Sequence, residues 1–209
     1  LIFFGCYICL YYGRIGFMPL DQSIIFDGAW RVLSGQIPFI DFYTPTGLTP
    51  ILFQALFFKY LGINWYTYVL HAAIFNSLFC ILIFTILRLL GGHLLISFFY
   101  ALLSGIIFYP PIGVPFMDQH SFFFTILYLT MGIAVVNNEN MIFKKTLIFL
   151  LPCAIGLSFF SKQNIAVFGI PLLIFILFKM KLVEIKRFYI IFILGITCFL
   201  GLIYYLIII

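Results

Sequence analysis

Long apolar runs, interrupted only by short clusters of charged or turn-forming residues, dominate this 209-residue sequence. Hydrophobic residue types make up 65% of the chain and charged types only 8%, whereas a soluble domain carries about 25% charged residues. So few charges cannot cover a water-facing surface, and lipid must therefore be the main solvent of this chain. We expect an all-α polytopic membrane protein, with residues 1–209 forming a single transmembrane domain.

The positions of the apolar runs predict about seven hydrophobic spans. They are Leu1–Tyr12, Tyr66–Leu90, Leu94–Pro110, Ser121–Val136, Thr146–Phe160, Ile165–Phe178 and Phe188–Ile209. Several are shorter than the roughly 20 residues that cross about 30 Å of hydrocarbon. The two runs that flank Ser161–Asn164 could instead form a re-entrant hairpin. Because the first run is short and the last one reaches the final residue, we expect an N-terminal fragment of a longer protein.

Lysine and arginine fall unevenly on the two sides of these spans. With the N-terminus inside, the inner segments hold Arg88, Lys144, Lys145, Lys179, Lys181, Lys186 and Arg187. The outer segments hold Arg14, Arg31, Lys59 and Lys162. The positive-inside rule then predicts a cytoplasmic N-terminus. The net charge of +5 is explained by this topology signal, and no nucleic-acid partner is expected.

The same orientation places every aspartate on the outer side of the membrane. These residues are Asp21, Asp27, Asp41 and Asp118. One interpretation is ordinary solvation of loops, and the other is a carboxylate-based site at the outer face.

The first loop, residues 13–65, is the most informative part of the sequence. Asp21 is a candidate N-cap and Gly35 a candidate C-terminal residue of a short helix with Trp30 as an interface anchor. A second helix is expected from Thr46 or Thr49 to a stop at Gly62. This loop is too apolar to extend freely into water, so both helices should lie at the membrane interface or pack on the spans.

The segment Gly28–Gly47 reads G-A-W-R-V-L-S-G-Q-I-P-F-I-D-F-Y-T-P-T-G and follows an early aspartate. It resembles the first outer loop of GT-C integral membrane glycosyltransferases, above all bacterial protein O-mannosyltransferase and aminoarabinose transferase-like members. The matching positions are Asp21, Ala29, Leu33, Gly35, Pro38, Phe39 and Asp41. Asp118-Gln119-His120 and Lys162-Gln163 also look similar to family features. Gln22 departs from members that carry two adjacent acids, and Phe39 stands where tyrosine is common.

The resemblance implies transfer of a sugar from a polyprenyl-phosphate carrier to a lipid, glycan or protein acceptor, at the extracytoplasmic face of the cell membrane. It implies that Asp21 is the catalytic carboxylate, although a plain helix cap is the alternative for this residue. The expected substrate-binding residues are Asp41, Tyr43, Asp118, His120, Lys162 and Gln163. A divalent cation could assist, with Asp21 and Asp118 as its candidate ligands. Asp41 could instead form a turn, and Lys162 could be a snorkelling loop lysine.

His71 lies on an otherwise apolar run and is expected to be a hydrogen-bonded packing residue, not a catalytic one. Three other classes of protein remain alternatives to the glycosyltransferase: a transporter or flippase, an O-antigen polymerase or ligase-like protein, and a non-catalytic membrane scaffold. A lipid or solute transporter or flippase would carry polar residues deep inside several spans. An O-antigen polymerase or ligase-like protein would also be polytopic, with a large arginine-rich loop later in the chain.

Overall fold

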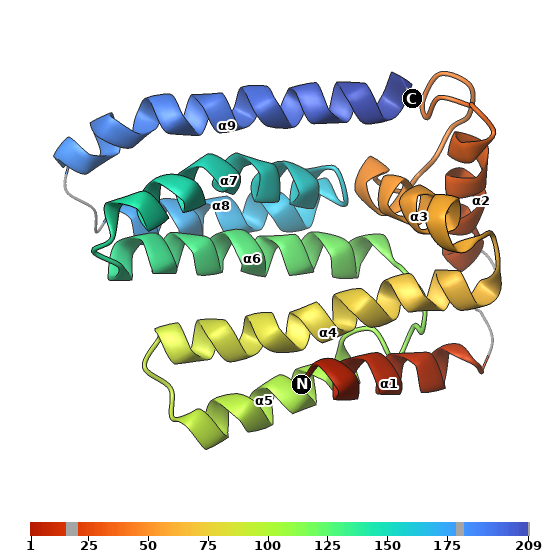
Figure 1. Ribbon diagram of the computed structural model, residues 1–209, viewed down its shortest axis with the longest axis horizontal. Coiled ribbons are helices and arrows are strands. Elements are labelled where there is room, and N and C mark those ends of the chain that lie inside the picture. The colour runs from red at the N-terminus through yellow and green to blue at the C-terminus, as the bar shows by residue number, and fades with distance from the viewer. Residues whose placement is uncertain (16–20, 179–181, 209) are drawn as a thin grey trace. The chain divides into compact units, whose positions relative to one another are not determined.

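The computed structural model describes the backbone of residues 1–15, 21–178 and 182–208, and the side chains of 1–15, 23–178 and 188–205. Within these ranges the chain is helical, apart from turns and one isolated bridge between Pro38 and Phe42. The prediction of an all-helical protein is therefore confirmed for the described residues. The helices are α1 (Ile2–Gly13), α2 (Asp21–Leu33), α3 (Leu48–Leu61), α4 (Trp65–Leu89), α5 (Leu94–Ile107), α6 (Met117–Asn137), α7 (Met141–Phe159), α8 (Gln163–Leu177) and α9 (Leu182–Ile208) (Figure 1).

The chain divides into two compact units, Leu1–His120 and Ser121–Ile209. In the first unit α1 and α5 both contact α4, while α3 contacts α2 and α4. In the second unit α7 contacts α8 and α9, and hydrogen bonds join α6 to α7 and α8. Whether residues 1–209 act as one transmembrane domain stays a prediction.

Four helical segments of the described chain are long and apolar enough to cross a membrane: α4, α6, α7 and Phe188–Tyr205 within α9. They support a membrane protein with transmembrane helices. The other apolar helices are α1, α3, α5 and α8, which have 12, 14, 14 and 15 residues. At 1.5 Å per residue, about 15 residues reach only some 22 Å, less than the hydrocarbon thickness. The number of about seven spans therefore stays a prediction.

Several helix boundaries differ from the predicted span ends; α9, for example, begins at Leu182, before the predicted start at Phe188. Helix α5 ends at Ile107, before Pro110, where the sequence pattern had continued the span. Helix α6 begins at Met117, four residues early, because polar residues are tolerated in a first helical turn. Helix α7 begins at Met141, where the side chain of Asn140 accepts hydrogen bonds from the N–H groups of Ile142 and Phe143.

Both helices predicted in the first loop are present. Helix α2 is followed by Gly35, whose φ of +84° is the left-handed conformation that ends helices. Helix α3 begins at Leu48, with Pro50 in its first turn, and stops at Gly62, whose φ is +87°. Turn chemistry at these two glycines thus predicted where the helices end.

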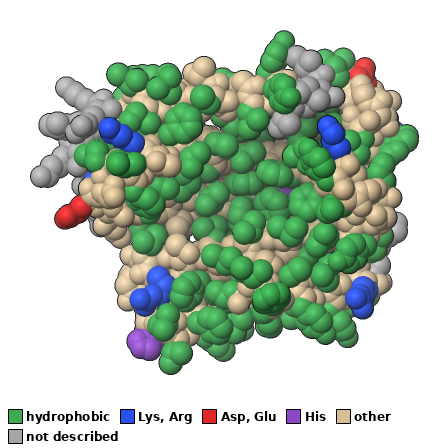
Figure 2. All heavy atoms as spheres, viewed as in Figure 1, with side chains coloured by type: hydrophobic (Ala, Val, Ile, Leu, Met, Phe, Trp, Pro, Cys, Tyr) green, Lys and Arg blue, Asp and Glu red, His purple; other side chains and the backbone are tan. Residues whose placement is uncertain are grey.

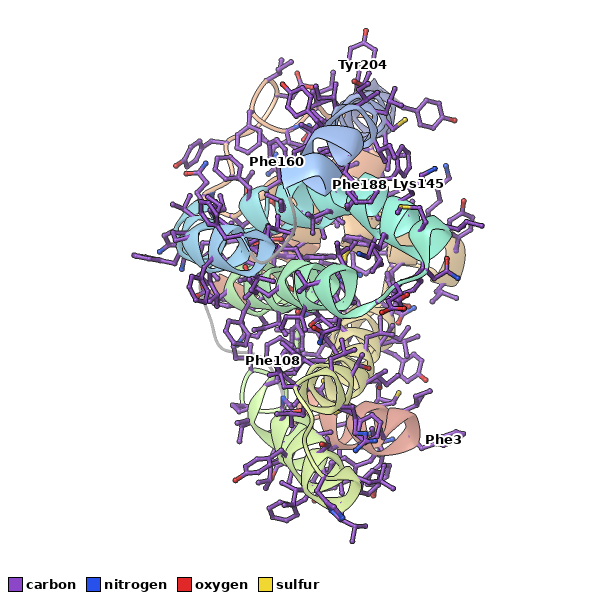
Figure 3. All side chains as sticks on the ribbon, turned by 90° about the vertical axis from the view of Figure 1, so that its left-hand side faces the viewer. Phe3, Phe108, Lys145, Phe160, Phe188 and Tyr204 are labelled. Carbon is purple, nitrogen blue, oxygen red and sulfur yellow. The ribbon has the colours of Figure 1, made fainter. Side chains whose placement is uncertain are left out.

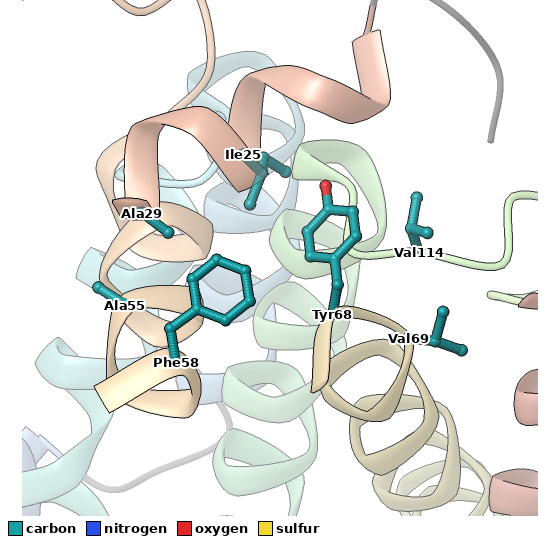
Figure 4. Packing of buried hydrophobic residues seen from close by; sticks show 7 residues of the cluster. All are labelled: Ile25, Ala29, Ala55, Phe58, Tyr68, Val69 and Val114. Carbon is teal, nitrogen blue, oxygen red and sulfur yellow. The ribbon is translucent and has the colours of Figure 1, made fainter. Parts of the chain in front are cut away.

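A hydrophobic cluster holds the first-loop helices against α4. It contains Ile25, Ala29, Ala55, Phe58, Tyr68, Val69 and Val114, all of which are buried (Figure 4). The ring of Phe26 adds edge contacts to Phe58 and Tyr68, with centroid distances of 4.7 and 5.3 Å. The loop is therefore packed on a candidate span rather than extended into solvent.

A buried asparagine, Asn76 of α4, ties together the backbones of the first unit. Its Nδ2 donates to the carbonyl oxygens of Gly5 in α1 and Gly105 in α5, at 2.8 and 2.9 Å. Its Oδ1 accepts from the N–H of Tyr109 at 3.3 Å. Small residues permit this close approach, since a Cβ on Gly5 would lie 2.9 Å from Cα of Ser77.

Hydroxyl groups join the helices of the second unit in the same way. The hydroxyl of Ser158 in α7 donates to the carbonyl oxygen of Ser121 in α6 at 2.8 Å and lies 2.8 Å from the hydroxyl of Thr125. The Tyr128 hydroxyl donates to the carbonyl oxygen of Ala166 in α8 at 2.8 Å. Buried polar side chains thus serve as contacts between helices in both units.

Large apolar side chains cover much of the exposed surface. In Figure 2 hydrophobic atoms predominate and charged groups are few. Phe3 of α1 and Tyr204 of α9 point away from their helices, with 91% and 70% of their surface exposed (Figure 3). An apolar surface of this extent is costly in water and suits contact with lipid.

We expect Asn76→Leu to lower the free energy of unfolding of the first unit by about 1–3 kcal/mol, because it removes three hydrogen bonds between buried groups. Thr85→Val is the matched control on the same helix, since its hydroxyl bonds only to the carbonyl oxygen of Ile81 and is exposed. Reversible unfolding in mixed micelles, followed by circular dichroism, measures both. Equal stability of the two variants would contradict the role given to Asn76.

Candidate functional site

Arg31 organises the segment that carries the resemblance. Its Nε donates to Oδ2 of Asp27 at 2.7 Å, one helical turn earlier in α2. Its Nη1 donates to Oε1 of Gln36 at 3.3 Å, and its guanidinium carbon lies 5.6 Å from the ring centre of Phe42. One cation therefore connects the last turn of α2 with the segment that follows it.

The segment after Gln36 forms a tight turn around Asp41. Its Oδ2 accepts from the N–H of Ile37 at 2.7 Å, and its own N–H donates to the carbonyl oxygen of Ile37 at 2.9 Å. Phe39 within this turn has a φ of +67°, a strained conformation for a residue with a side chain. The turn-forming interpretation of Asp41 thus has direct support, while its carboxylate stays exposed.

The same turn presents apolar side chains to the outside. Phe39, Ile40 and Tyr43 have 59%, 77% and 84% of their surface exposed. A strained turn with an exposed apolar tip fits contact with a lipid surface or with a substrate. Tyr43, a predicted substrate-binding residue, is therefore accessible beside Asp41.

An open hollow of about 510 Å³ lies along α2. It is lined by Ser23, Phe26, Asp27, Trp30, Ile63 and Trp65. The indole N–H of Trp65 donates to the carbonyl oxygen of Gly13 at 3.0 Å, which fixes the orientation of that ring. Aromatic walls with a hydroxyl and a carboxylate are the composition expected of a small-molecule site.

The predicted catalytic residue, Asp21, is the first residue of α2, the helix that forms one wall of this hollow. Its side chain lies outside the described part of the structure. The assignments of Asp21 as a base, a helix cap or a metal ligand therefore stay predictions.

The first unit also contains a buried hydrogen-bonded array, which shares no residue with the lining of the hollow. Nδ1 of His71 in α4 lies 2.8 Å from Oε1 of Gln54 in α3. Nε2 of His71 lies 2.9 Å from Nε2 of His120 in the first turn of α6. Nδ1 of His120 lies 2.6 Å from the hydroxyl of Tyr109 and 3.0 Å from the carbonyl oxygen of Phe116. All four side chains are fully buried.

Sequence reasoning found only part of this array. The prediction that His71 is a hydrogen-bonded packing residue is confirmed by its burial and its two partners. His120 was expected to bind substrate, and the structure places its ring against His71 and Tyr109 inside the protein. Gln54 and Tyr109 were not singled out. A lone polar residue in each apolar run was the available signal.

The remaining predicted residues lie at helix starts. Asp118 is in the first turn of α6 and is partly buried. Lys162 is the N-cap residue of α8, where its carbonyl oxygen accepts from the Ser121 hydroxyl at 2.8 Å, and Gln163 is exposed beside it. Lys162 and Gln163 belong to the second unit, so their participation in a site with first-unit residues stays a prediction.

No group of three or more histidine, cysteine, aspartate or glutamate side chains in the described part of the chain could hold a metal ion. This search does not cover the carboxylate of Asp21. The divalent cation suggested by the sequence therefore stays a prediction, and no chemical step is assigned to it.

Comparison of the chain with known protein families, curated proteins and solved structures gave no match. The likeness to GT-C glycosyltransferases thus rests on the residues of the first loop and on the two short later motifs.

We expect Arg31→Gln to raise amide hydrogen exchange about five-fold across residues 36–42, because it removes an ion pair, a hydrogen bond and a cation–π contact worth roughly 1 kcal/mol together. Arg14→Gln makes the same change of charge at an exposed residue and is the matched control. Mass spectrometry of peptides from the exchanged protein reports both. Unchanged exchange in the Arg31 variant would contradict its role as the organiser of this segment.

Proposed function

We propose that this protein is a membrane glycosyltransferase that transfers a sugar from a polyprenyl-phosphate carrier to an acceptor. The observation that carries the proposal is the aromatic hollow along α2, on the same helix as the predicted catalytic Asp21. The hollow lies within the loop whose residues resemble the GT-C family. The acceptor class is a lipid, a glycan or a protein.

The lining of the hollow suits a sugar attached to a lipid. The rings of Trp30 and Trp65 offer flat apolar surfaces to the C–H faces of a sugar, while Ser23 and Asp27 offer polar groups to its hydroxyls. Oδ2 of Asp27 is engaged with Arg31, and 55% of the Asp27 side chain is exposed. The exposed apolar turn at Phe39, Ile40 and Tyr43 would lie against the lipid.

The proposed reaction breaks the bond between C1 of the sugar and the oxygen of the carrier phosphate. A new bond forms between C1 and the acceptor oxygen or nitrogen, with inversion at C1. Asp21 takes the proton that the acceptor loses, as a general base. A cationic side chain stabilises the negative charge on the released polyprenyl phosphate, and Lys162 is the candidate for this role. Asp41, Tyr43, Asp118 and Gln163 are the candidates for contacts with the two substrates.

The proposed location is the cytoplasmic membrane of a bacterial cell, with the N-terminus in the cytoplasm and the site on the extracytoplasmic face. The bias of lysine and arginine toward the inner segments supports this orientation. Membrane lipid is then the surrounding solvent and the carrier's own environment.

We expect Asp21→Asn to reduce sugar transfer about 10²–10⁴-fold, since that is the usual contribution of a general base. Transfer from labelled polyprenyl-phosphate sugars is measured in membranes that contain equal amounts of inserted protein. Glu139→Gln removes an exposed carboxylate outside the first loop; it is the matched control and should retain most of the activity. Trp30→Ala should raise KM more than it lowers kcat. Equal transfer by Asp21→Asn and the unaltered protein would refute the catalytic assignment.

A second candidate function, a transporter or flippase for a lipid or solute, is favoured by the buried His71–His120 pair. Ionisable and amide side chains inside apolar helices are costly and commonly serve transport pathways. Reconstituted vesicles distinguish the two functions, because a flippase moves an unmodified fluorescent polyprenyl-phosphate sugar between leaflets without an acceptor. We expect no such movement if the glycosyltransferase proposal holds, and protein-dependent movement without transfer would favour the flippase.

A further inference from the structure

The array of Gln54, His71, His120 and Tyr109 can hold its protons in two alternative arrangements. Neither proposed function requires this. Each hydrogen bond in it joins groups that can exchange the roles of donor and acceptor, since imidazole and amide groups carry both. Because the array is fully buried, each bond constrains the next. The protons along the array therefore cannot be placed independently.

One arrangement follows from the carbonyl oxygen of Gln54 facing His71. Nδ1 of His71 must then carry the proton, which leaves Nε2 as an acceptor. Nε2 of His120 must carry a proton to donate to it across 2.9 Å. Nδ1 of neutral His120 is then an acceptor, and the Tyr109 hydroxyl donates to it at 2.6 Å. All donors in this first state point from Tyr109 toward Gln54.

The opposite arrangement satisfies Gln54 and both histidines but leaves the proton of the Tyr109 hydroxyl without an acceptor among the described residues. If the amide of Gln54 turns over, its Nε2 donates to Nδ1 of His71. The proton of His71 is then on Nε2 and that of His120 on Nδ1, where the carbonyl oxygen of Phe116 accepts it at 3.0 Å. Each imidazole keeps one proton and only changes the nitrogen that carries it. All donors in this second state point from Gln54 toward Phe116.

Tyr109 favours the first state. Its buried hydroxyl has His120 Nδ1 as its hydrogen-bond partner among the described residues, so its proton is satisfied only when that nitrogen accepts it. Cys9 of α1 and Tyr68 of α4 are the other titratable side chains that act on Tyr109. The only other titratable group acting on the His71 ring from a neighbouring element, among the described residues, is His120.

We propose that this array is a two-state switch in which the donor at Tyr109 sets the direction of every hydrogen bond as far as Gln54. The switch links the segment between α5 and α6 to α3 through α4. The group that differs between the two states is the end of the Gln54 amide that faces away from His71. In the structure this is Nε2, which is buried and has no hydrogen-bond partner among the described atoms. That end presents a donor in the first state and an acceptor in the second.

A chemical group that binds at the unpartnered Nε2 of Gln54 can change which state the array adopts. A hydrogen-bond acceptor that reaches Nε2 of Gln54 stabilises the first state and is repelled by the second. A hydrogen-bond donor does the reverse. The state of Tyr109 and the chemical group bound beside Gln54 are therefore thermodynamically coupled, in both directions.

Histidine tautomers measure the state directly. The chain has three histidines, so nitrogen-15 spectra of imidazole-labelled protein in lipid nanodiscs hold few signals. His93 is exposed and outside the array, and His93→Gln assigns its signal. We expect the unaltered protein to carry the proton on Nδ1 in His71 and on Nε2 in His120. The same nitrogen protonated in both rings would overturn the proposal without any variant.

Variants at the two ends of the array test the coupling. Tyr109→Phe removes the donor at one end, and Gln54→Leu removes the acceptor at the other. We expect Tyr109→Phe to reverse both tautomers, so that the proton moves to Nε2 in His71 and to Nδ1 in His120. Gln54→Leu keeps the donor at Tyr109 and should therefore leave both tautomers unchanged. Tyr68→Phe removes a buried hydroxyl outside the array and should leave both unchanged.

Signal dispersion shows which variants remain folded. A folded Tyr109→Phe variant in which only His120 changes would overturn the proposal, since each ring would then be set locally. Reversal of both rings in folded Gln54→Leu would overturn it as well, because Tyr109 is intact there. Reversal of the distant ring, His71, in folded Tyr109→Phe supports the proposal. If neither variant folds, a proton on Nδ1 of His71 and on Nε2 of His120 in the unaltered protein supports it, and any other pattern refutes it.

Discussion

The rule that no polar group in an apolar interior can rely on water governs this structure. Helices satisfy the backbone, but a polar side chain within an apolar helix must find its partner on another element. Asn76 meets this demand by bonding to the backbones of α1 and α5 and of the segment that follows α5. These bonds require small residues where α1 and α5 approach α4, because larger side chains at Gly5 or Gly105 would separate the helices.

Local structure could be predicted because the signals for it are local. Apolar runs predicted the described helices, and Gly35 and Gly62 marked two helix ends through their positive φ. Boundaries were less accurate where polar residues join a first turn, as at Met117 and Asn140. A hydrophobicity pattern excludes such residues from a span, whereas the unpaired N–H groups of a helix start favour them.

The partners of the buried polar residues could not be predicted. A histidine in an apolar run indicates that some partner exists, but His71 and His120 are 49 residues apart and on different helices. Many pairings of Gln54, His71, Asn76 and Tyr109 would satisfy the same rule. Only the packing of α3, α4 and α5 selects among them, and single-sequence patterns carry no information about that packing. The hollow was missed for the same reason, since Ile63 and Trp65 join it from outside α2.

The first unit thus contains two polar systems with opposite character. The Asp27–Arg31 pair and the Asp41 turn are charged and exposed, so they can meet a substrate but gain little stability from their interactions. The His71–His120 array is enclosed, so a substrate cannot contact its rings without a change in packing. Bonds in such a low-dielectric interior are strong and direct one another. This contrast is why we propose substrate chemistry at the first loop and transmission between helices in the array.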